Sequence, residues 1–228
     1  MKQQLSIQDF SRQEKRRKAL ELETMVHCDF VHDNGENPAA REMAQKIVEN
    51  FPALRQNGTG LFLFGGPRAG KSFLGAEIVN ELTDRGYKCY MTSLLGLFNY
   101  LSNCYGETRS RFLEKLFGLD LLVLDDFGLQ AATQLNDQTL MYIVVTCQKL
   151  HIPLIVITHN HPDALMKSGG DGKPPELLCR IRRCCLDFNV IMPGARRSRL
   201  LQMKKETRRM LNVETANTAP VQQELPLK

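Results

Sequence analysis

The sequence LFLFGGPRAGKS occupies residues 61–72 and decides the fold class of this 228-residue chain. Its first four residues are apolar and predict a short buried strand, whereas residues 71–85 repeat apolar side chains at helical spacing. Between them lies the pattern G-x-x-x-x-G-K-S, whose glycines allow backbone N–H groups to turn inward around phosphates at a helix N-terminus. We therefore predict a nucleotide-binding loop made of Gly65, Gly66, Pro67, Arg68, Ala69, Gly70, Lys71 and Ser72.

Three residues of this loop have separate expected roles. Lys71 is expected to neutralise the β- and γ-phosphates, and the hydroxyl of Ser72 to ligate Mg²⁺. Arg68 stands where many such loops have glycine, so its side chain could either assist the phosphates or narrow the site. We expect binding to survive, because no single side chain makes the phosphate cradle.

A second acidic element is needed for hydrolysis, and the sequence LLVLDD at residues 121–126 supplies one. Four apolar residues predict a buried strand, and the carboxyl ends of parallel strands meet at the ligand-binding edge of a sheet. We expect Asp125 to hold Mg²⁺ through water and Asp126 to polarise the attacking water. The alternative is a buried strand that simply ends in an Asp-Asp turn.

The sequence LIVITHN at residues 154–160 predicts another strand that ends in polar residues at the same edge of the sheet. We expect Asn160 to hydrogen-bond both the attacking water and the γ-phosphate. Thr-His-Asn is also ordinary turn chemistry. His159 and His161 are interpreted as surface or cap residues.

Short apolar runs alternate with helical segments along most of the chain, which predicts a central parallel α/β sheet flanked by helices. Asn37 followed by proline marks the start of a helix that reaches about residue 50. The predicted strands are 61–64, 87–92, 121–124, 154–158 and 186–191. We expect a short basic helical arm and linker at 1–35, an ATPase domain at 36–212 and a disordered tail at 213–228.

Composition excludes several classes of protein. No apolar run approaches the roughly 20 residues that a membrane span needs, and the N-terminus lacks a secretory signal pattern. The seven cysteines form no C-x-x-C pair, which indicates reduced thiols and a cytoplasmic protein.

Charge is concentrated near the end of the chain. Residues 180–209 contain ten Lys or Arg against two acids, although the whole chain has 30 Lys or Arg against 25 Asp or Glu. This pattern points to a polyanion or an acidic partner, or else to a solvated, solubilising surface. Phe188 is the one aromatic residue in the stretch, so base stacking is not expected there.

Four motifs taken together resemble the AAA+ ATPases of the DnaC/DnaI helicase-loader and IstB transposition-protein group. They are GPRAGKS, LLVLDDFG, ITHN and LLCRIR, and the resemblance covers about residues 30–201. It implies ATP as ligand, Mg²⁺ as cofactor, and self-association through the ATP site. It also implies that Arg180 acts in trans as an arginine finger on the neighbouring subunit, and that Arg197 is a second nucleotide-sensing arginine.

The resemblance favours a loader of the replicative helicase whose arm engages the helicase and whose basic stretch binds single-stranded DNA. Asp126 stands where many AAA+ enzymes have Glu, so we expect slow hydrolysis, which suits a switch better than a motor. The alternatives are an IstB-like transposition ATPase that binds duplex DNA and a transposase, and a non-hydrolysing, nucleotide-gated DNA-binding adaptor. A small-molecule kinase would need an acceptor pocket and a mobile basic lid, and neither is clear in the sequence.

Overall fold

The computed structural model describes residues 7–128, 134–167 and 175–210. The chain divides into two compact units, residues 1–192 and 193–228. The described part of the second unit is one helix with its preceding residues, α10 (Gly194–Met210). No helix in the described ranges is long and apolar enough to cross a membrane.

The first unit is built on a five-stranded sheet in the order β2-β3-β4-β1-β5, and every neighbouring pair is parallel. This confirms the predicted α/β architecture. The strands are β1 (Gly60–Phe64), β2 (Cys89–Ser93), β3 (Leu121–Phe127), β4 (Leu154–Thr158) and β5 (Cys185–Asn189).

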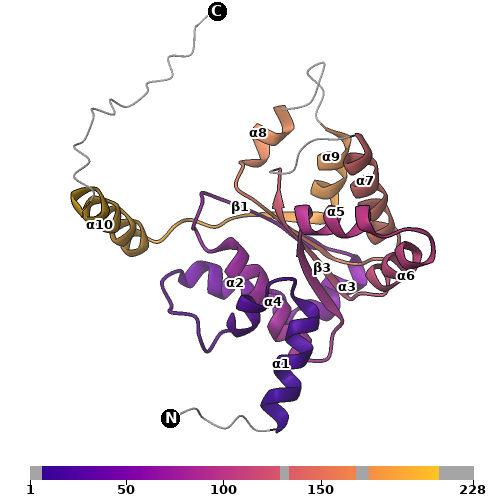
Figure 1. Ribbon diagram of the computed structural model, residues 1–228, viewed down its shortest axis with the longest axis horizontal. Helices are drawn as coiled ribbons and strands as arrows, with labels where there is room; N and C mark the ends of the chain where they lie inside the picture. Colours follow the sequence, from indigo (N-terminus) through magenta and orange to yellow (C-terminus); the bar gives the residue numbers. More distant parts are fainter. Residues whose placement is uncertain (1–6, 129–133, 168–174, 211–228) are drawn as a thin grey trace, which may run out of the picture. The chain divides into compact units, whose positions relative to one another are not determined.

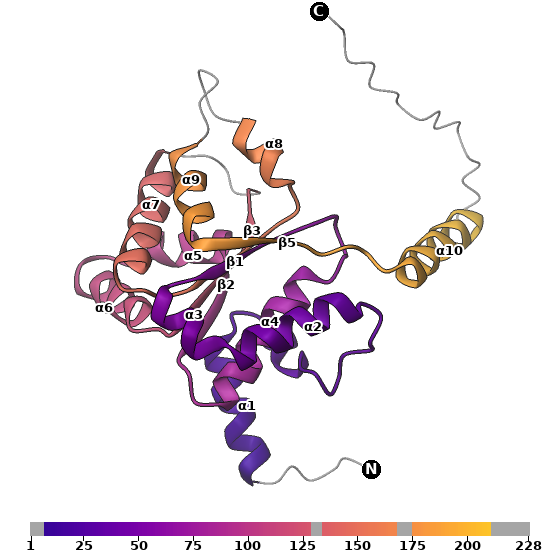
Figure 2. The same ribbon diagram turned by 180° about the vertical axis from the view of Figure 1, so that it is seen from behind.

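Helices cover both faces of this sheet (Figure 1), and the view from behind shows the same two layers (Figure 2). One face carries α1 (Ile7–Ala19), the short 3-10 helix η1 (Glu23–His27), α2 (Pro38–Glu49), α3 (Phe51–Asn57) and α4 (Lys71–Asp84). The other carries α5 (Leu94–Asn103), α6 (Gly106–Phe117), α7 (Gln134–Lys149) and α9 (Glu176–Cys184), whereas α8 (Pro162–Lys167) follows β4.

Alternation along the strands explains why both faces are covered. In β1, Leu61 and Leu63 belong to the core on the α4 side, whereas Phe62 belongs to the core on the α7 side. Successive side chains of a strand point to opposite faces, so a continuous apolar run buries both faces of a sheet. The same alternation holds for β3 and β4.

Most predicted elements lie where the sequence placed them. The side chain of Asn37 accepts a hydrogen bond from the backbone N–H of Ala40, as expected for the N-cap of α2. The strand β3 continues past residue 124, where the predicted strand ends, and includes both aspartates. The predicted tail at 213–228 lies outside the described residues.

The N-terminal segment, expected to be an arm, is packed into the first unit as far as it is described. Ala19, Leu20 and Val26 are buried in the core beside α4. Leu20 forms a parallel bridge with Met91 of the edge strand β2, which extends the sheet by one residue pair. Burial of these apolar residues favours the packing of the segment against the sheet domain.

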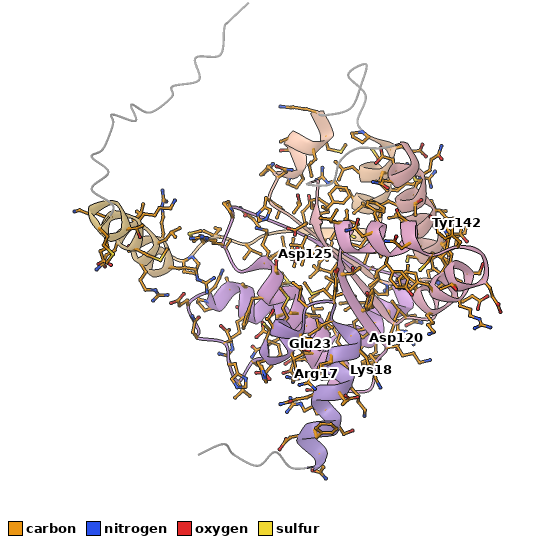
Figure 3. All side chains as sticks on the ribbon, in the orientation of Figure 1. Arg17, Lys18, Glu23, Asp120, Asp125 and Tyr142 are labelled. Atoms are coloured by element: carbon orange, nitrogen blue, oxygen red, sulfur yellow. The ribbon has the colours of Figure 1, made fainter. Side chains whose placement is uncertain are left out.

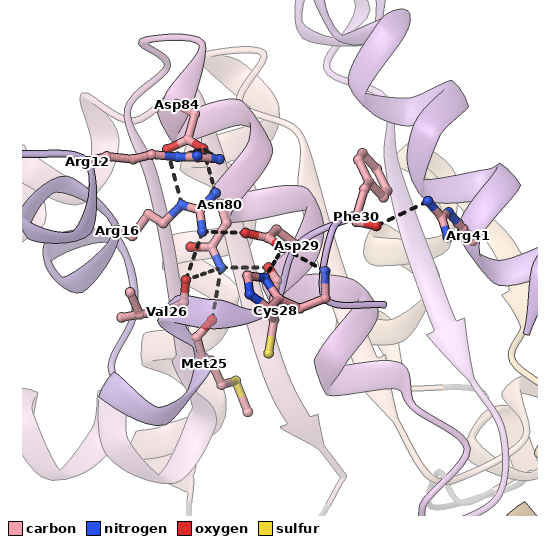
Figure 4. Close-up of polar contacts among 11 residues, drawn as sticks. Arg12, Arg16, Met25, Val26, Cys28, Asp29, Phe30, Arg41, Asn80 and Asp84 are labelled. Atoms are coloured by element: carbon pink, nitrogen blue, oxygen red, sulfur yellow. Dashed lines mark hydrogen bonds and ion pairs between the residues drawn. The ribbon is translucent and has the colours of Figure 1, made fainter. Parts of the chain in front are cut away.

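A buried polar network fastens this segment to α4 (Figure 4). The guanidinium of Arg16 donates to Asp84 at 2.6 and 3.1 Å, to Asp29 at 2.9 Å and to the carbonyl of Val26 at 2.9 Å. The side-chain amide of Asn80 donates to backbone carbonyls of residues 25, 26 and 28. Burial favours a raised pKa for Asp29, but hydrogen bonds from Arg16 and His32 hold that pKa at about 2.

We expect Arg16→Ala to lower the free energy of unfolding by about 3–5 kcal/mol, because it leaves the buried carboxylate of Asp29 without its cation. Arg12→Ala is the matched control. Arg12 also pairs with Asp84, but its side chain is 48% exposed, so its loss should cost about 0–1 kcal/mol. Urea denaturation of the two variants measures the difference, and equal small losses would show that Arg16 does not hold the segment.

Candidate nucleotide-binding site

The glycine-rich loop connects β1 to α4 and depends on unusual backbone angles. Gly65 has φ of 145° and Gly70 has φ of 100°, a region that L side chains rarely adopt. A Cβ at Gly65 would lie 2.3 Å from the carbonyl oxygen of Val190. The loop therefore passes so close to the chain after β5 that only glycine fits there.

Arg68 occupies the left-handed region, with φ of 62°. Glycine adopts this conformation without strain, whereas a residue with a Cβ does so at a cost of about 1–2 kcal/mol. The glycine that many such loops carry at this position therefore suits the backbone found here. Arg68 is exposed, so its larger side chain lies outside the buried core.

Lys71 begins α4 and points back into the loop. Its Nζ donates to the carbonyl oxygens of Gly65 at 2.9 Å and Gly66 at 2.8 Å, and lies 3.1 Å from Nδ1 of His159. Burial lowers the pKa of Lys71, and the charges of Asp125 and Asp126 oppose that shift. An ammonium group is thus held inside the loop, where incoming phosphates would meet it.

Asp125 lies at the carboxyl end of β3, whereas Asp120 precedes the opposite end of the same strand (Figure 3). Asp125 is 8% exposed. Burial raises its pKa, and hydrogen bonds from the side chain of Ser72 and the backbone N–H of Asp126 oppose that shift. The structure thus brings together the two predicted metal ligands, Ser72 and Asp125, from α4 and β3.

The donor set formed by Ser72 and Asp125 fits magnesium. A carboxylate and a hydroxyl are hard oxygen ligands, and Mg²⁺ is commonly bound by one or two carboxylates together with water and phosphate oxygens. The Ser72 side chain lowers the pKa of Asp125 against the effect of burial, which indicates that the two side chains lie close together. Ser72 lies at the start of α4 and Asp125 lies near the end of β3. Ser72 directly follows Lys71, which ends the glycine-rich loop.

Asp126 leaves the regular path of its strand. Its φ is 57°, and the pairing of β3 with β4 shifts register between residues 124 and 127. The backbone N–H of Asp126 donates to Oδ1 of Asp125 at 2.8 Å. At this irregular point of β3 the Asp126 side chain is 47% exposed, in contrast with the buried side chain of Asp125 before it.

Asn160 lies just beyond β4, close to the chain that follows β3. Its backbone N–H donates to the hydroxyl of Thr158, which in turn donates to the carbonyl of Phe127 at 2.7 Å. A Cβ on Gly128 would lie 3.0 Å from Nδ2 of Asn160. These contacts hold the predicted water-binding amide at the same edge of the sheet as the two aspartates.

His159 is the residue that the sequence interpretation missed. The sequence pattern places it at the surface or in a cap, whereas in the structure its Nδ1 lies 3.1 Å from Nζ of Lys71 and its Nε2 lies 3.6 Å from Oδ1 of Asp126. Its place directly after β4, beside the predicted Asn160, was the available signal. His161 matches the interpretation as a cap, because its Nδ1 accepts from the backbone N–H of Asp163 in α8.

The two predicted nucleotide-sensing arginines lie on separate helices. Arg180 is on α9 and donates to Oε1 of Glu176 at 2.7 and 3.0 Å, with its side chain 37% exposed. Gln148 of α7 donates to the backbone carbonyl of Arg180 at 2.7 Å. Arg197 is on α10, in the second unit. The roles of both residues stay predictions.

Two curated relatives from Escherichia coli K12 share part of the chain. YdaV is 28% identical over 120 residues, which are 52% of this chain and 48% of YdaV. The replicative helicase loader DnaC is 26% identical over 136 residues, which are 58% of this chain and 54% of DnaC. The chain therefore spans about half the length of each of these relatives.

The fold resembles that of a solved structure, and the sequence matches a known family. The crystal structure of DnaI superposes with a TM-score of 0.62 at 19% identity, and the match covers 77% of this chain and 99% of that one. This likeness shows that the two chains share their fold, in agreement with the predicted fold class. IstB-like ATP binding proteins match residues 2–167, a span that includes the loop, both aspartates and Asn160. The chain belongs to the family of IstB-like ATP binding proteins.

Proposed function

We propose that this protein is an ATPase that loads a replicative helicase and is controlled by ATP-dependent assembly. The observation that carries the proposal is the group at the carboxyl edge of the sheet, where Lys71, Ser72, Asp125 and Asp126 come together from α4 and β3. The shared sequence with the DnaC loader supports the choice of a helicase as partner.

Each residue of the group has a distinct task in this proposal. The loop and Lys71 bind the phosphates, Ser72 and Asp125 hold Mg²⁺, and Asp126 and Asn160 orient the attacking water. Bound Mg²⁺ would supply positive charge that neutralises the phosphate oxygens. An aspartate reaches about one methylene less than the more usual glutamate, so hydrolysis is expected to be slow and to time the release of the partner.

Assembly would complete the site. Arg180 is paired with Glu176 on the surface of α9 by an ion pair with both side chains partly exposed, which is weak in water. A neighbouring subunit's nucleotide could therefore draw the guanidinium away at little cost. Completion of the site in trans makes hydrolysis depend on subunit association.

The basic stretch at 180–209 is proposed to follow a single DNA strand. Lys204 and Lys205 on α10 are exposed, as backbone-binding cations must be. Phosphate neutralisation by such residues gives affinity that depends on salt and tolerates any sequence. The segment before residue 36 is proposed to contribute to helicase binding.

The second candidate is a transposition ATPase that binds duplex DNA and a transposase. It is favoured by the family match itself, which is to IstB-like proteins over residues 2–167. A pull-down from the native host, with and without a non-hydrolysable ATP analogue, separates the two. Capture of a replicative helicase supports the loader, and capture of a transposase contradicts it.

We expect Lys71→Ala to weaken ATP binding by roughly 10- to 100-fold, because a charge-assisted hydrogen bond to the phosphates is lost. Isothermal titration calorimetry measures the change. Lys46→Ala is the control, since Lys46 lies on α2 with its side chain 62% exposed. Unchanged affinity in Lys71→Ala would contradict the assignment of the nucleotide-binding loop.

We expect Arg180→Ala to reduce the ATPase rate of the assembled protein at least 100-fold, as is typical when an arginine finger is removed. ATP binding to the isolated subunit should stay unchanged. Lys46→Ala, on α2 and outside both proposed sites, is the control and should retain activity. Loss of ATP binding in isolated Arg180→Ala would show that the residue acts within its own subunit.

We expect affinity for single-stranded DNA to fall as salt rises, with a log–log slope of about 0.7 per phosphate contact. Lys204→Glu combined with Lys205→Glu should weaken binding and lower that slope. Fluorescence anisotropy with a labelled oligonucleotide measures both, with Lys46→Glu as the control. An affinity that ignored salt concentration would refute backbone contact.

A further inference from the structure

Lys71 has no unused hydrogen-bond donor in the structure. An ammonium group carries three hydrogens and accepts nothing, and the Lys71 Nζ lies within hydrogen-bond distance of three acceptors, Gly65 O, Gly66 O and His159 Nδ1. The residue is also 3% exposed. A phosphate oxygen can therefore bind this ammonium only by replacing one of the three acceptors.

The contact with Lys71 decides which nitrogen of His159 carries the proton. Because the ammonium can only donate, Nδ1 must be the unprotonated, accepting nitrogen of a neutral imidazole. The ring proton then lies on Nε2, which is 3.6 Å from Oδ1 of Asp126. The imidazole thus accepts from the lysine on one side and presents a donor to the aspartate on the other.

His159 is the acceptor best able to give way. The other two acceptors are main-chain carbonyls of the loop itself, and one of them belongs to Gly65, which is packed against Val190. The His159 side chain is 35% exposed and follows the last residue of β4. Rotation of this side chain is therefore easier than movement of the loop backbone.

Asp126 needs a partner to fix its carboxylate. It adopts φ of 57°, a conformation that costs energy for any residue with a Cβ, and its side chain is 47% exposed. A half-exposed carboxylate at this irregular point of β3 has more than one rotamer open to it. Nε2 of His159 lies 3.6 Å from Oδ1 of Asp126, and a hydrogen bond formed by closing this distance would select one of them.

We propose that His159 is a positioning residue that links Lys71 to Asp126, an inference that rests on the ATPase function proposed above. Without nucleotide, its Nδ1 accepts from Lys71 and competes with phosphate. When phosphate takes the ammonium, the ring is released from Lys71 and closes on Asp126 through Nε2–H. Occupancy of the loop and orientation of the water-activating carboxylate are thereby coupled through one side chain.

Three substitutions separate the two halves of this link. An asparagine amide reaches about as far as Nδ1, so His159→Asn keeps an acceptor for Lys71 and loses the donor to Asp126. A glutamine amide reaches about as far as Nε2, so His159→Gln keeps the donor and loses the acceptor. His159→Ala loses both. His161→Ala is the control, since His161 packs edge-on against Phe64 and lies outside the link.

The expected pattern is a split between affinity and turnover. His159→Ala and His159→Gln should bind ATP about fivefold more tightly, because one competing hydrogen bond is gone. His159→Ala and His159→Asn should lower kcat about tenfold, whereas His159→Gln and the control His161→Ala should keep it. Calorimetry and steady-state assays of the full chain measure these values.

Damage to the fold would weaken binding and turnover together, so parallel losses in all three variants would overturn the inference, as would three unchanged variants. A measurement on the unmodified protein is independent of folding in the variants. Nitrogen NMR of the ligand-free protein should show the Nε2–H tautomer of His159, and the Nδ1–H tautomer would overturn the inference. Failure of the unmodified protein to bind ATP would instead remove the proposed function first.

Discussion

The burial of α4 is the constraint on which the first unit depends. Ten of its fourteen residues are buried, and its neighbours are the sheet on one side and α1 and α2 on the other (Figure 1). Gly75 lies close against the sheet, since a Cβ there would lie 2.7 Å from a side-chain carbon of Ile157. With its path fixed in this way, the helix holds Lys71 at one end and Asp84 at the other.

The same helix also buries a carboxyl group, Glu77, which is unfavourable without a hydrogen-bond partner. Glu77 is 1% exposed, and its Oε1 has no hydrogen-bond partner among the described residues. Burial raises the pKa of Glu77 to about 8, and the nearby charge of Asp33 adds to the shift. A neutral carboxyl is therefore favoured at neutral pH, which avoids most of the free energy that a buried, unpaired charge would cost.

The sequence predicted the architecture and the loop because both depend on local patterns. The strands around residues 61–64 and 154–158 are short apolar runs, and their period and length are enough to place them. The packing of the N-terminal segment could not be predicted in that way. It depends on the contact between Arg16 and Asp84, which lie 68 residues apart in the chain. A run of charged residues in the sequence does not show which distant charges it will pair with. His159 was missed for the same reason, since its contact is with a lysine 88 residues away.

The bridge between Leu20 and Met91 and the hydrogen bonds of Arg16 with Asp84 and Asp29 make the N-terminal segment a structural part of the first unit. A segment that only binds a partner can be deleted without exposing the core of the remaining domain. Here, a fragment that begins at residue 36 would lack the core residues Ala19, Leu20 and Val26. Apolar side chains of α4 would then be exposed to water. Such a fragment would be prone to aggregation, so its insolubility would say nothing about partner binding.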